Sequence, residues 1–442
     1  MNLKGVRTLV VGLKKSGAAA VELLRREGAV VRATDLKPLE ELPDARGLDI
    51  PFARQTDAVF EDCDLIVLSP DVPADLAPLA AARSRGVRVI GDVELAAPYL
   101  RGRVIGITGS NGKTTTTSLT GHILREAGVP VQVGGNIGVP VAAMIASSRE
   151  DGWSVLELSS FQLETIGCFR AHVAALLNVT QNHLDRHHTF ENYAAAKGRI
   201  FENQQPGDLA ILNAGDPVSA AYAPQVKADI EWFGSRRDVE PGATLRDGEL
   251  VLHGEPLMPA ADVPIRGRHN LENVMAASLA ASRAGVGRAA IAAAVRTFKA
   301  VEHRLEFVRR TGGMDFYNDS KATSVDATLK ALDAFPGGLW VILGGKDKGL
   351  DYRALREPLA AKARAALLIG AAAAKIGAAL AGAVPLVESG TLDAAVAHAV
   401  AHGAPGDTVL LAPACASFDQ FTSFEHRGEV FKKIVEGLGE KS

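Results

Sequence analysis

The chain has little cysteine and lacks long apolar runs. Its three cysteines, Cys63, Cys168 and Cys415, lie far apart among 442 residues. Their odd number and wide spacing exclude a disulfide framework and a four-cysteine zinc site. No apolar run approaches the ~18 residues of a membrane span, and the first residues lack the apolar core and cleavage site of a signal peptide. We therefore expect a cytoplasmic protein without a membrane partner.

The chain also lacks a surplus of charge of either sign. Lysine and arginine total 48 and aspartate and glutamate 51, which gives a net charge of −3. No basic excess favours nucleic acid or an anionic membrane surface, so we expect neither partner and place any anion site locally. Hydrophobic residues at 47% and charged residues at 22% are ordinary for a globular protein. At about 150 residues per domain, the length predicts three domains.

Glycine is abundant, at 44 of 442 residues. Apolar β-type runs alternate with Ala/Leu-rich helical runs, a pattern typical of parallel sheets with crossover helices. We predict an α/β fold with a Rossmann-like N-terminal domain (1–93), a central P-loop ATPase-type parallel-sheet domain (94–300) and a C-terminal Rossmann-like domain (301–442). Short segments with turn residues at 226–264 predict small antiparallel strands.

The strongest motif is the glycine-rich segment Ile105–Thr115, which joins a predicted strand, Val104–Ile107, to a predicted helix, Lys113–Ala127. Backbone N–H groups of such a turn and the helix N-terminus attract phosphate. Lys113 would neutralise phosphate charge, and the Thr114 hydroxyl could reach Mg²⁺. The spacing is not the standard one, because Ile107 stands where the first glycine is expected. The alternative is a glycine-rich turn that binds nothing.

Three further positions are candidates for metal or ligand chemistry. Glu157 ends an apolar strand and could hold Mg²⁺, although strand-end glutamates are more often caps or surface ion pairs. His183 and Asp185 lie in a polar loop, which could equally be solvated; the neighbouring histidines lack a second cluster with zinc-ligand spacing. Lys197, from the residues alone, is an ordinary solvated helical lysine.

The later chain adds three clusters. Asn270 stands at a helix start and is, on its own, more simply an N-cap. Arg304 and Lys321 could meet phosphate or carboxylate charge, or form surface ion pairs. The loops at 344–348 and 413–421 follow strands, as binding loops do. Cys415 lacks a local histidine partner and is interpreted as a packing residue.

In this order, from the phosphate loop to the cluster at 318–323, the motifs resemble the Mur ligases, ATP-dependent amide-forming enzymes of peptidoglycan assembly. The resemblance covers nearly the whole chain. Segments 156–162, 318–323 and 414–421 are most similar to the members that add D-glutamate to UDP-N-acetylmuramoyl-L-alanine, and the Asp-Asn-Pro-Arg motif of the diaminopimelate- or lysine-adding members is absent. The implied reaction proceeds through an acyl phosphate and releases ADP and phosphate.

The resemblance also implies a role for each matching residue. ATP would contact Gly109, Ser110, Asn111, Gly112, Lys113, Thr114, Thr115, Asn270, Arg304, Asp319 and Lys321. Two Mg²⁺ ions would be held by Thr114, Glu157, His183 and Lys197, with Lys197 carbamylated; Lys113, Glu157, His183 and Lys197 would form the catalytic set. UDP-sugar would contact Leu13, Ser16, Asp35, Lys37 and Asn136, and D-glutamate Thr323, Lys348, Ser417, Phe418 and Phe424.

Two departures from the family pattern fall in the first domain. Lys14 replaces a usually small residue, and Asp71 stands in place of the glycine of Ser-Pro-Gly. An aspartate near a diphosphate is electrostatically unfavourable, and Lys14 could offset its charge. The rival interpretations are a folylpolyglutamate synthetase-like ligase, which the N-terminal domain with Asp35 argues against, and a P-loop nucleotide sensor without chemistry. A nicotinamide dehydrogenase is disfavoured because residues 12–17 lack G-x-G-x-x-G. We expect a monomer whose third domain closes onto the second.

Overall fold

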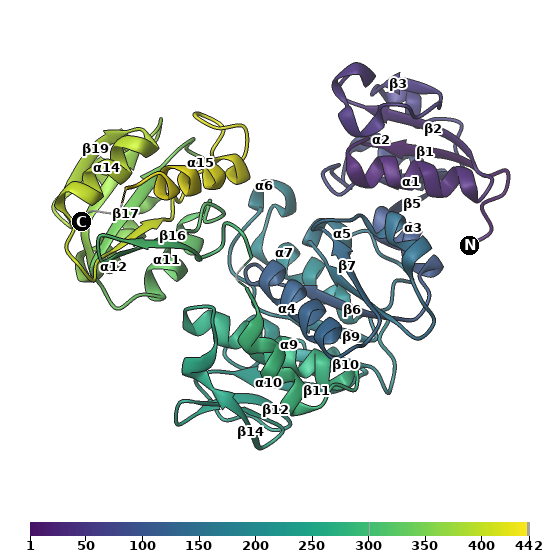
Figure 1. Cartoon of the computed structure of the whole chain (residues 1–442). Helices are drawn as coiled ribbons and strands as arrows, with labels where there is room; N and C mark the ends of the chain where they lie inside the picture. The colour runs from purple at the N-terminus through teal and green to yellow at the C-terminus, as the bar shows by residue number, and fades with distance from the viewer. Residues whose placement is uncertain (300, 440–442) are drawn as a thin grey trace. The chain divides into compact units, whose positions relative to one another are not determined.

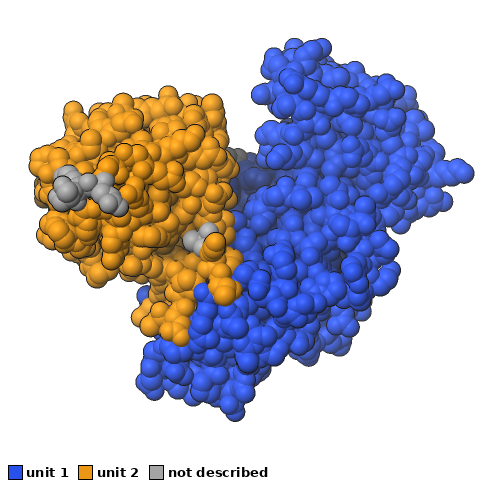
Figure 2. Space-filling model, viewed as in Figure 1, with its two compact units in different colours: residues 1–260, 272–296 blue, residues 261–271, 297–442 orange. Residues whose placement is uncertain are grey.

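The computed structural model describes residues 1–299 and 301–439, and the side chain of Asp185 lies outside the described part. The chain forms two compact units, one of residues 1–260 and 272–296 and the other of residues 261–271 and 297–442 (Figure 2). Within the described residues, no helix has the length and apolar content needed to cross a membrane.

The first sheet is fully parallel, with strand order β3-β2-β1-β4-β5. Its strands alternate with helices, as the βαβ pattern requires (Figure 1). The elements are β1 (Arg7–Val11), α1 (Lys15–Arg26), β2 (Val30–Asp35), β3 (Phe52–Arg54), β4 (Leu65–Leu68), α2 (Ala77–Ser84), β5 (Arg88–Gly91) and α3 (Asp92–Ala96).

The second sheet has nine strands in the order β14-β13-β12-β11-β10-β9-β6-β8-β7. It is parallel from β7 to β12, and only β12, β13 and β14 pair antiparallel. Its strands are β6 (Arg103–Thr108), β7 (Val131–Gly135), β8 (Trp153–Glu157), β9 (Val173–Leu176), β10 (Leu209–Asn213), β11 (Asp229–Gly234), β12 (Gly242–Arg246), β13 (Glu249–Leu252) and β14 (Glu255–Pro259). The helices along it are α4 (Lys113–Glu126), α5 (Ser160–Leu163), α6 (Leu184–His187), α7 (Phe190–Gly198), α8 (Pro217–Ala220), α9 (Arg268–Arg283) and α10 (Arg288–Thr297).

The third sheet has the order β15-β16-β20-β17-β18-β19, and only its edge strand β15 runs antiparallel. Its strands are β15 (Glu306–Thr311), β16 (Met314–Asn318), β17 (Leu339–Gly344), β18 (Ala363–Ile369), β19 (Leu386–Gly390) and β20 (Thr408–Leu411). Its helices are α11 (Val325–Asp333), α12 (Arg356–Lys362), α13 (Ala373–Leu380), α14 (Leu392–His402) and α15 (Phe424–Glu436).

Helices cover both faces of the third sheet, and β17 shows why. Val341 and Leu343 belong to one buried cluster, whereas Trp340 and Ile342 belong to another. Because successive side chains of a strand point to opposite faces, an almost wholly apolar strand needs apolar cover on both sides. The first cluster includes Leu332 of α11, and the second includes Val396 of α14.

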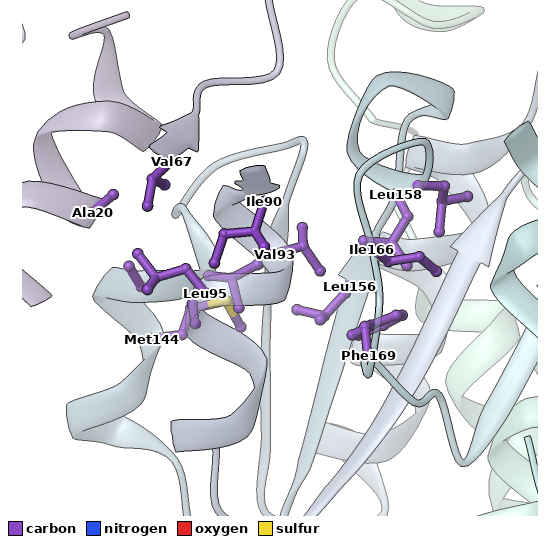
Figure 3. Close-up of a cluster of buried hydrophobic side chains, with 14 of the residues drawn as sticks. Ala20, Val67, Ile90, Val93, Leu95, Met144, Leu156, Leu158, Ile166 and Phe169 are labelled. Atoms are coloured by element: carbon purple, nitrogen blue, oxygen red, sulfur yellow. The ribbon is translucent and has the colours of Figure 1, made fainter. Parts of the chain in front are cut away.

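One apolar core runs from the first sheet into the second. Figure 3 shows Val67 of β4, Val93 and Leu95 of α3, and Leu156 of β8 within the same buried cluster. Leu95 is fully buried although it lies in the short segment between the two sheets. The first sheet therefore shares its core with the second.

The predicted fold class is confirmed: the molecule is α/β with three largely parallel sheets. The prediction of antiparallel strands at 226–264 is wrong for β11, which pairs parallel with both β10 and β12. The preceding strand, β10, lies next to β9 and offers β11 a parallel partner, which extends the parallel sheet. The domain bounds at residues 93 and 300 stay predictions.

Candidate functional site

The glycine-rich turn connects β6 to α4 at the carboxyl edge of the second sheet, where α/β proteins bind ligands. Gly112 has φ of 83° just before the first residue of α4. A Cβ at this position would lie 2.3 Å from Oδ1 of Asn273. Both the backbone angle and the space therefore require glycine here.

Residues after β9 hold this turn in place. The Ser110 N–H donates to the Asn178 carbonyl at 2.8 Å, and the Asn111 N–H donates to Asn178 Oδ1 at 2.9 Å. The Thr180 N–H donates to Ser110 Oγ at 2.9 Å, and Tyr193 Oη lies 3.0 Å from the same oxygen. Sequence reasoning did not single out these supports individually, although their position after a buried strand next to β6 was a usable signal.

Lys113 begins α4, and its Nζ donates to the carbonyls of Gly109 and Ser110 at 2.9 and 3.1 Å. Its charge is thus held over the turn. Thr114 and Thr115 follow in the first helical turn and are buried. The turn joins a cation to a helix N-terminus, an arrangement that attracts phosphate.

Glu157 lies beside the turn, because β8 pairs with β6 and places it opposite Ile107. The side chain is 2% exposed. Asn136 donates from Nδ2 to Glu157 Oε1 at 2.8 Å, whereas Oε2 is buried without a hydrogen-bond partner among the described residues. An unpartnered buried carboxylate oxygen is costly, so Glu157 fits a cation ligand better than a surface ion pair.

Lys197 of α7 is fully buried, so its interpretation as a solvated lysine is wrong. Its Nζ donates to the Gly109 carbonyl at 2.8 Å and lies 4.8 Å from the centre of the Tyr193 ring. Burial lowers the pKa of Lys197 well below its ordinary value, and the charge of Lys113 lowers it further against the opposing effect of Glu157. A neutral, nucleophilic amine is therefore favoured beneath the turn.

His183 lies on the exposed side of this group. Its backbone is left-handed, with φ of 52°, and its ring centre is 5.0 Å from that of Phe161 on α5. In the described part of the chain, no three His, Cys, Asp or Glu side chains gather closely enough to hold a metal ion. A cation at Glu157 would thus need at least one ligand from outside these residue types.

The residues predicted for UDP gather after β1 and β2. Asp35 accepts from the N–H groups of Leu13 at 2.8 Å and Lys37 at 3.0 Å. Leu13 is fully buried, and its N–H already donates its hydrogen bond to Asp35. A cavity of about 380 Å³ lies next to these loops, and its lining includes Ser16 and Asn136. The first and second sheets therefore contribute jointly to one cavity.

The two residues that depart from the family pattern face each other in this cavity. Lys14 Nζ lies 2.5 Å from Asp71 Oδ2, and both side chains are largely exposed. The lysine therefore offsets the carboxylate charge directly, in agreement with the compensation expected from the sequence.

The other predicted nucleotide residues belong to the second compact unit. Asp319 follows β16 and is buried; burial raises its pKa to about 7, while the Arg304 charge and a hydrogen bond from the Leu305 backbone act in the opposite direction. Asn270 lies inside α9, which begins at Arg268, and its Nδ2 donates to the Arg266 carbonyl at 2.6 Å. The N-cap interpretation of Asn270 is therefore wrong.

The residues predicted for D-glutamate lie in the same unit. Lys348 Nζ donates to the Thr323 carbonyl at 3.3 Å, and Lys321 Nζ lies 5.1 Å from the ring centre of Phe424. Ser417 is buried, whereas Phe418 is 66% exposed. The structure thus joins Lys348 to Thr323 and Lys321 to Phe424, and it buries Cys415 with Sγ 3.1 Å from Tyr352 Oη. Burial raises the pKa of Cys415, as expected for a packing thiol.

Comparison with known proteins gives three matches to family models. They are described as "Mur ligase MurD-like, N-terminal domain" for residues 6–91, "Mur ligase middle domain" for residues 107–281 and "Mur ligase, glutamate ligase domain" for residues 303–415. A protein of Solibacter usitatus named UDP-N-acetylmuramoylalanine–D-glutamate ligase is 75% identical over 100% of both chains. The chain belongs to the Mur ligase family.

A second Mur ligase of the same name, from Acidobacterium capsulatum, is 52% identical over 98% of this chain and 97% of its own. Among solved structures, a pseudomurein peptide ligase type C from Methanothermus fervidus has a TM-score of 0.62 at 18% identity, covering 98% of this chain and 100% of its own. UDP-N-acetylmuramate–alanine ligase from Thermotoga maritima has a TM-score of 0.61 at 18% identity, covering 98% and 99%. These two establish the fold.

Mur ligases are ATP-dependent and generally Mg²⁺-dependent enzymes that act on small molecules in peptidoglycan assembly, and this chain is one of them. Glu157 and Lys197 are buried, and Lys113 half-buried, around one turn of this Mur ligase. The turn, Glu157 and the cavity all belong to the first compact unit.

Proposed function

We propose that this Mur ligase joins D-glutamate to UDP-N-acetylmuramoyl-L-alanine and converts ATP to ADP and phosphate. The names of its highly identical relatives support D-glutamate as the amino-acid acceptor of the reaction. The observation that carries the chemistry is the group of the half-buried Lys113 and the buried Glu157 and Lys197 around the turn at 109–112. Such a group can hold a triphosphate and a cation next to each other.

A carboxylate and an amine do not condense spontaneously in water, so the carboxylate must first be activated. One oxygen of the L-alanyl carboxylate attacks the γ-phosphorus of ATP, and the bond to the bridging oxygen of ADP breaks. Lys113 and the N–H groups of the turn stabilise charge on the transferred phosphoryl group. The free amine of D-glutamate then attacks the acyl carbon, phosphate leaves, and the nitrogen loses a proton to give the amide.

Mg²⁺, when bound, would supply additional positive charge to the phosphoryl oxygens. The unpartnered Oε2 of Glu157 fits this role, and Thr114 and His183 are proposed as further ligands. We assign Lys197 to a carbamate: its neutral amine adds to CO₂ and releases a proton. This conversion would replace a buried cation by an anionic oxygen ligand and would complete two Mg²⁺ sites.

The remaining assignments place each substrate at a described group of residues. UDP-sugar is assigned to the 380 Å³ cavity with Ser16 and Asn136, and D-glutamate to the residues around Lys348 and Thr323. We propose that the enzyme is a cytoplasmic monomer, for which size-exclusion chromatography with light scattering would give 46.3 kDa. A nucleotide sensor without chemistry would not need the additional set of Arg304, Asp319 and Lys321 in the second compact unit.

One assay tests the proposal. Phosphate release is measured with ATP and UDP-N-acetylmuramoyl-L-alanine, comparing D-glutamate, L-glutamate, L-alanine and meso-diaminopimelate as acceptors. We expect release with D-glutamate and at most background release with the other three. Equal release with L-glutamate, or a preference for another acceptor, contradicts the assignment. Release without any acceptor points to a nucleotidase.

A further inference from the structure

Arg427 is the largest fully buried side chain in the described part of the molecule. It lies in the first turn of α15, and its guanidinium connects two loops of the third sheet. On one side, Nε donates to Ser320 Oγ at 2.9 Å and Nη2 donates to the Ser320 carbonyl at 2.8 Å. On the other side, Nη1 and Nη2 each donate to the Cys415 carbonyl at 3.2 Å, and Nη1 also reaches the Ala416 carbonyl at 3.5 Å.

The four acceptors of these five hydrogen bonds are all neutral oxygens. Burial lowers the pKa of Arg427 to about 10, and the carboxylate of Asp419 counteracts this only in part. A buried cation is costly unless its donors are well satisfied. A planar guanidinium meets this requirement because its donors diverge in fixed directions, which an ammonium group cannot reproduce. The position therefore selects arginine for geometry as much as for charge.

The two loops joined by Arg427 carry the residues assigned to the amino-acid acceptor. One loop, residues 318–323, follows β16 and ends with Thr323. The other, residues 413–418, follows β20 and includes Ser417. Ser320 Oγ also donates to the carbonyl of Phe424, the first residue of α15, at 2.8 Å. Arg427 thus fixes the separation of three segments at one end of the sheet.

The first loop has other supports. Asp319 N–H donates to the Leu411 carbonyl at 2.9 Å, and Lys321 N–H donates to the His303 carbonyl at 3.1 Å. The 413–418 loop is bound by the Ala414 N–H, which donates to the Ala322 carbonyl at 2.9 Å, and by the Lys346 N–H, which donates to the Ala416 carbonyl at 2.8 Å, while the Cys415 carbonyl receives two donors from the Arg427 guanidinium. Loss of the guanidinium should therefore displace the peptide at Cys415, next to Ser417, whereas Asp319 and Lys321 keep their own backbone hydrogen bonds. Acceptor binding would suffer more than nucleotide binding.

We propose that Arg427 is a positioning residue for the amino-acid acceptor, which it serves by holding the 413–418 loop at a fixed distance from the 318–323 loop. This inference rests on the proposed function for the identity of the acceptor. It adds that Arg427, which has no assigned contact with a substrate, determines the KM for the amino-acid acceptor.

The test compares Arg427→Lys with the wild type and with Lys433→Met, a change at an exposed lysine on the same helix. Arg427→Lys keeps the positive charge but loses the diverging N–H donors of the guanidinium. Since a charged hydrogen bond contributes roughly tenfold or more in an equilibrium constant, we expect the KM for D-glutamate to rise about tenfold. The KM values for ATP and for UDP-N-acetylmuramoyl-L-alanine should stay within about threefold, and Lys433→Met should match the wild type.

A second readout separates positioning from general damage. Without D-glutamate, hydroxylamine can trap the acyl phosphate, and we expect Arg427→Lys to form the trapped product at the wild-type rate. An unchanged KM for D-glutamate in the folded variant, or equal losses in trapping and in amide formation, overturns the proposal. If Arg427→Lys does not fold, the same comparison is made with Ser320→Ala. This variant removes the hydroxyl that accepts a hydrogen bond from Arg427 Nε.

Failure of the proposed function would look different. If the wild-type enzyme prefers another amino acid, the acceptor assignment fails, and the same KM comparison is then made with that amino acid. An effect of Arg427→Lys confined to that acceptor still supports the positioning role.

Discussion

Burial changes the chemistry of single residues in this enzyme, and Lys197 is the sharpest case. Its pattern in the sequence was that of a solvated helical lysine, because nothing local distinguishes it. Only the packing of α7 under the phosphate turn places Nζ 2.8 Å from the Gly109 carbonyl and desolvates the amine. The sequence alone therefore could not yield its role, and the resemblance to the family was needed.

If Lys197 serves as a carbamate, Lys197→Ala should lose nearly all amide formation. The variant leaves a space beside Glu157, so added short carboxylic acids should restore part of the rate by supplying the missing oxygen ligand. Steady-state phosphate release with and without acetate measures this rescue. Lys227→Ala, at an exposed lysine, serves as the control. Full unaided activity of Lys197→Ala would contradict the carbamate.

Asp319 should make stability depend on pH. Burial raises its pKa from 3.8 to about 7, so between these values the native state binds more protons than the unfolded chain. The free energy of unfolding contributed by this group therefore falls as the pH rises from about 4 to about 7, by a few kcal/mol at most. Asp319→Asn removes this titration.

We expect the melting temperature of Asp319→Asn to decline less than that of the wild type over this pH range. Calorimetry across pH 4 to 8 measures the difference. Asp92, whose pKa burial raises to about 6, acts in the same direction and remains in both proteins. Glu429→Gln, at an exposed carboxylate, should leave the wild-type slope unchanged, and identical slopes for all three proteins would refute the assignment.

At the scale of elements, the loops after β1 and β4 meet across the cavity assigned to UDP-sugar. Asp71 brings a negative charge toward a diphosphate, and Lys14 offsets it at 2.5 Å. Exposed ion pairs contribute only about 0–1 kcal/mol to stability, so changes here should act on binding and leave folding intact.

Asp71→Asn should therefore lower the KM for UDP-N-acetylmuramoyl-L-alanine about two- to fivefold, and Lys14→Ala should raise it, with equal melting temperatures. Both effects should shrink at high salt, because the groups are exposed. Initial rates at two ionic strengths check this, and the KM for D-glutamate is the internal control. A higher KM for Asp71→Asn would show that the carboxylate itself binds the substrate.

Most element positions near the site were predictable because local patterns determine them. The predicted strand Val104–Ile107 and the predicted helix Lys113–Ala127 match β6 and α4 within one residue at either end. Supports such as Asn178 and Arg427 were not predicted, because their partners lie 67 and 107 residues away along the chain. The parallel pairing of β11 was missed for another reason: its partners β10 and β12 are its neighbours in the chain, but the direction of pairing is set by the assembled sheet, whereas a strand's own sequence mainly indicates its extent.

At the scale of the whole molecule, three sheets do not make three independently melting parts. The apolar cluster in Figure 3 is continuous from Val67 through Leu95 to Leu156, so the first two sheets bury one core together. The residues of the third sheet have separate clusters, with Leu380 in one of them. Cooperative unfolding follows shared burial, so we expect two calorimetric transitions that correspond to the two compact units.

Two matched substitutions assign these transitions. Leu95→Ala and Leu380→Ala each remove a fully buried side chain, which costs about 2–5 kcal/mol. We expect Leu95→Ala to lower only the melting temperature of the transition that UDP-N-acetylmuramoyl-L-alanine raises by binding to the cavity of the first unit, and Leu380→Ala to lower only the other. A separate low-temperature transition caused by Leu95→Ala would mean that the first sheet melts alone, because the continuous core would then not couple it to the second. A shift of both transitions by either substitution would instead mean that unfolding couples the two units.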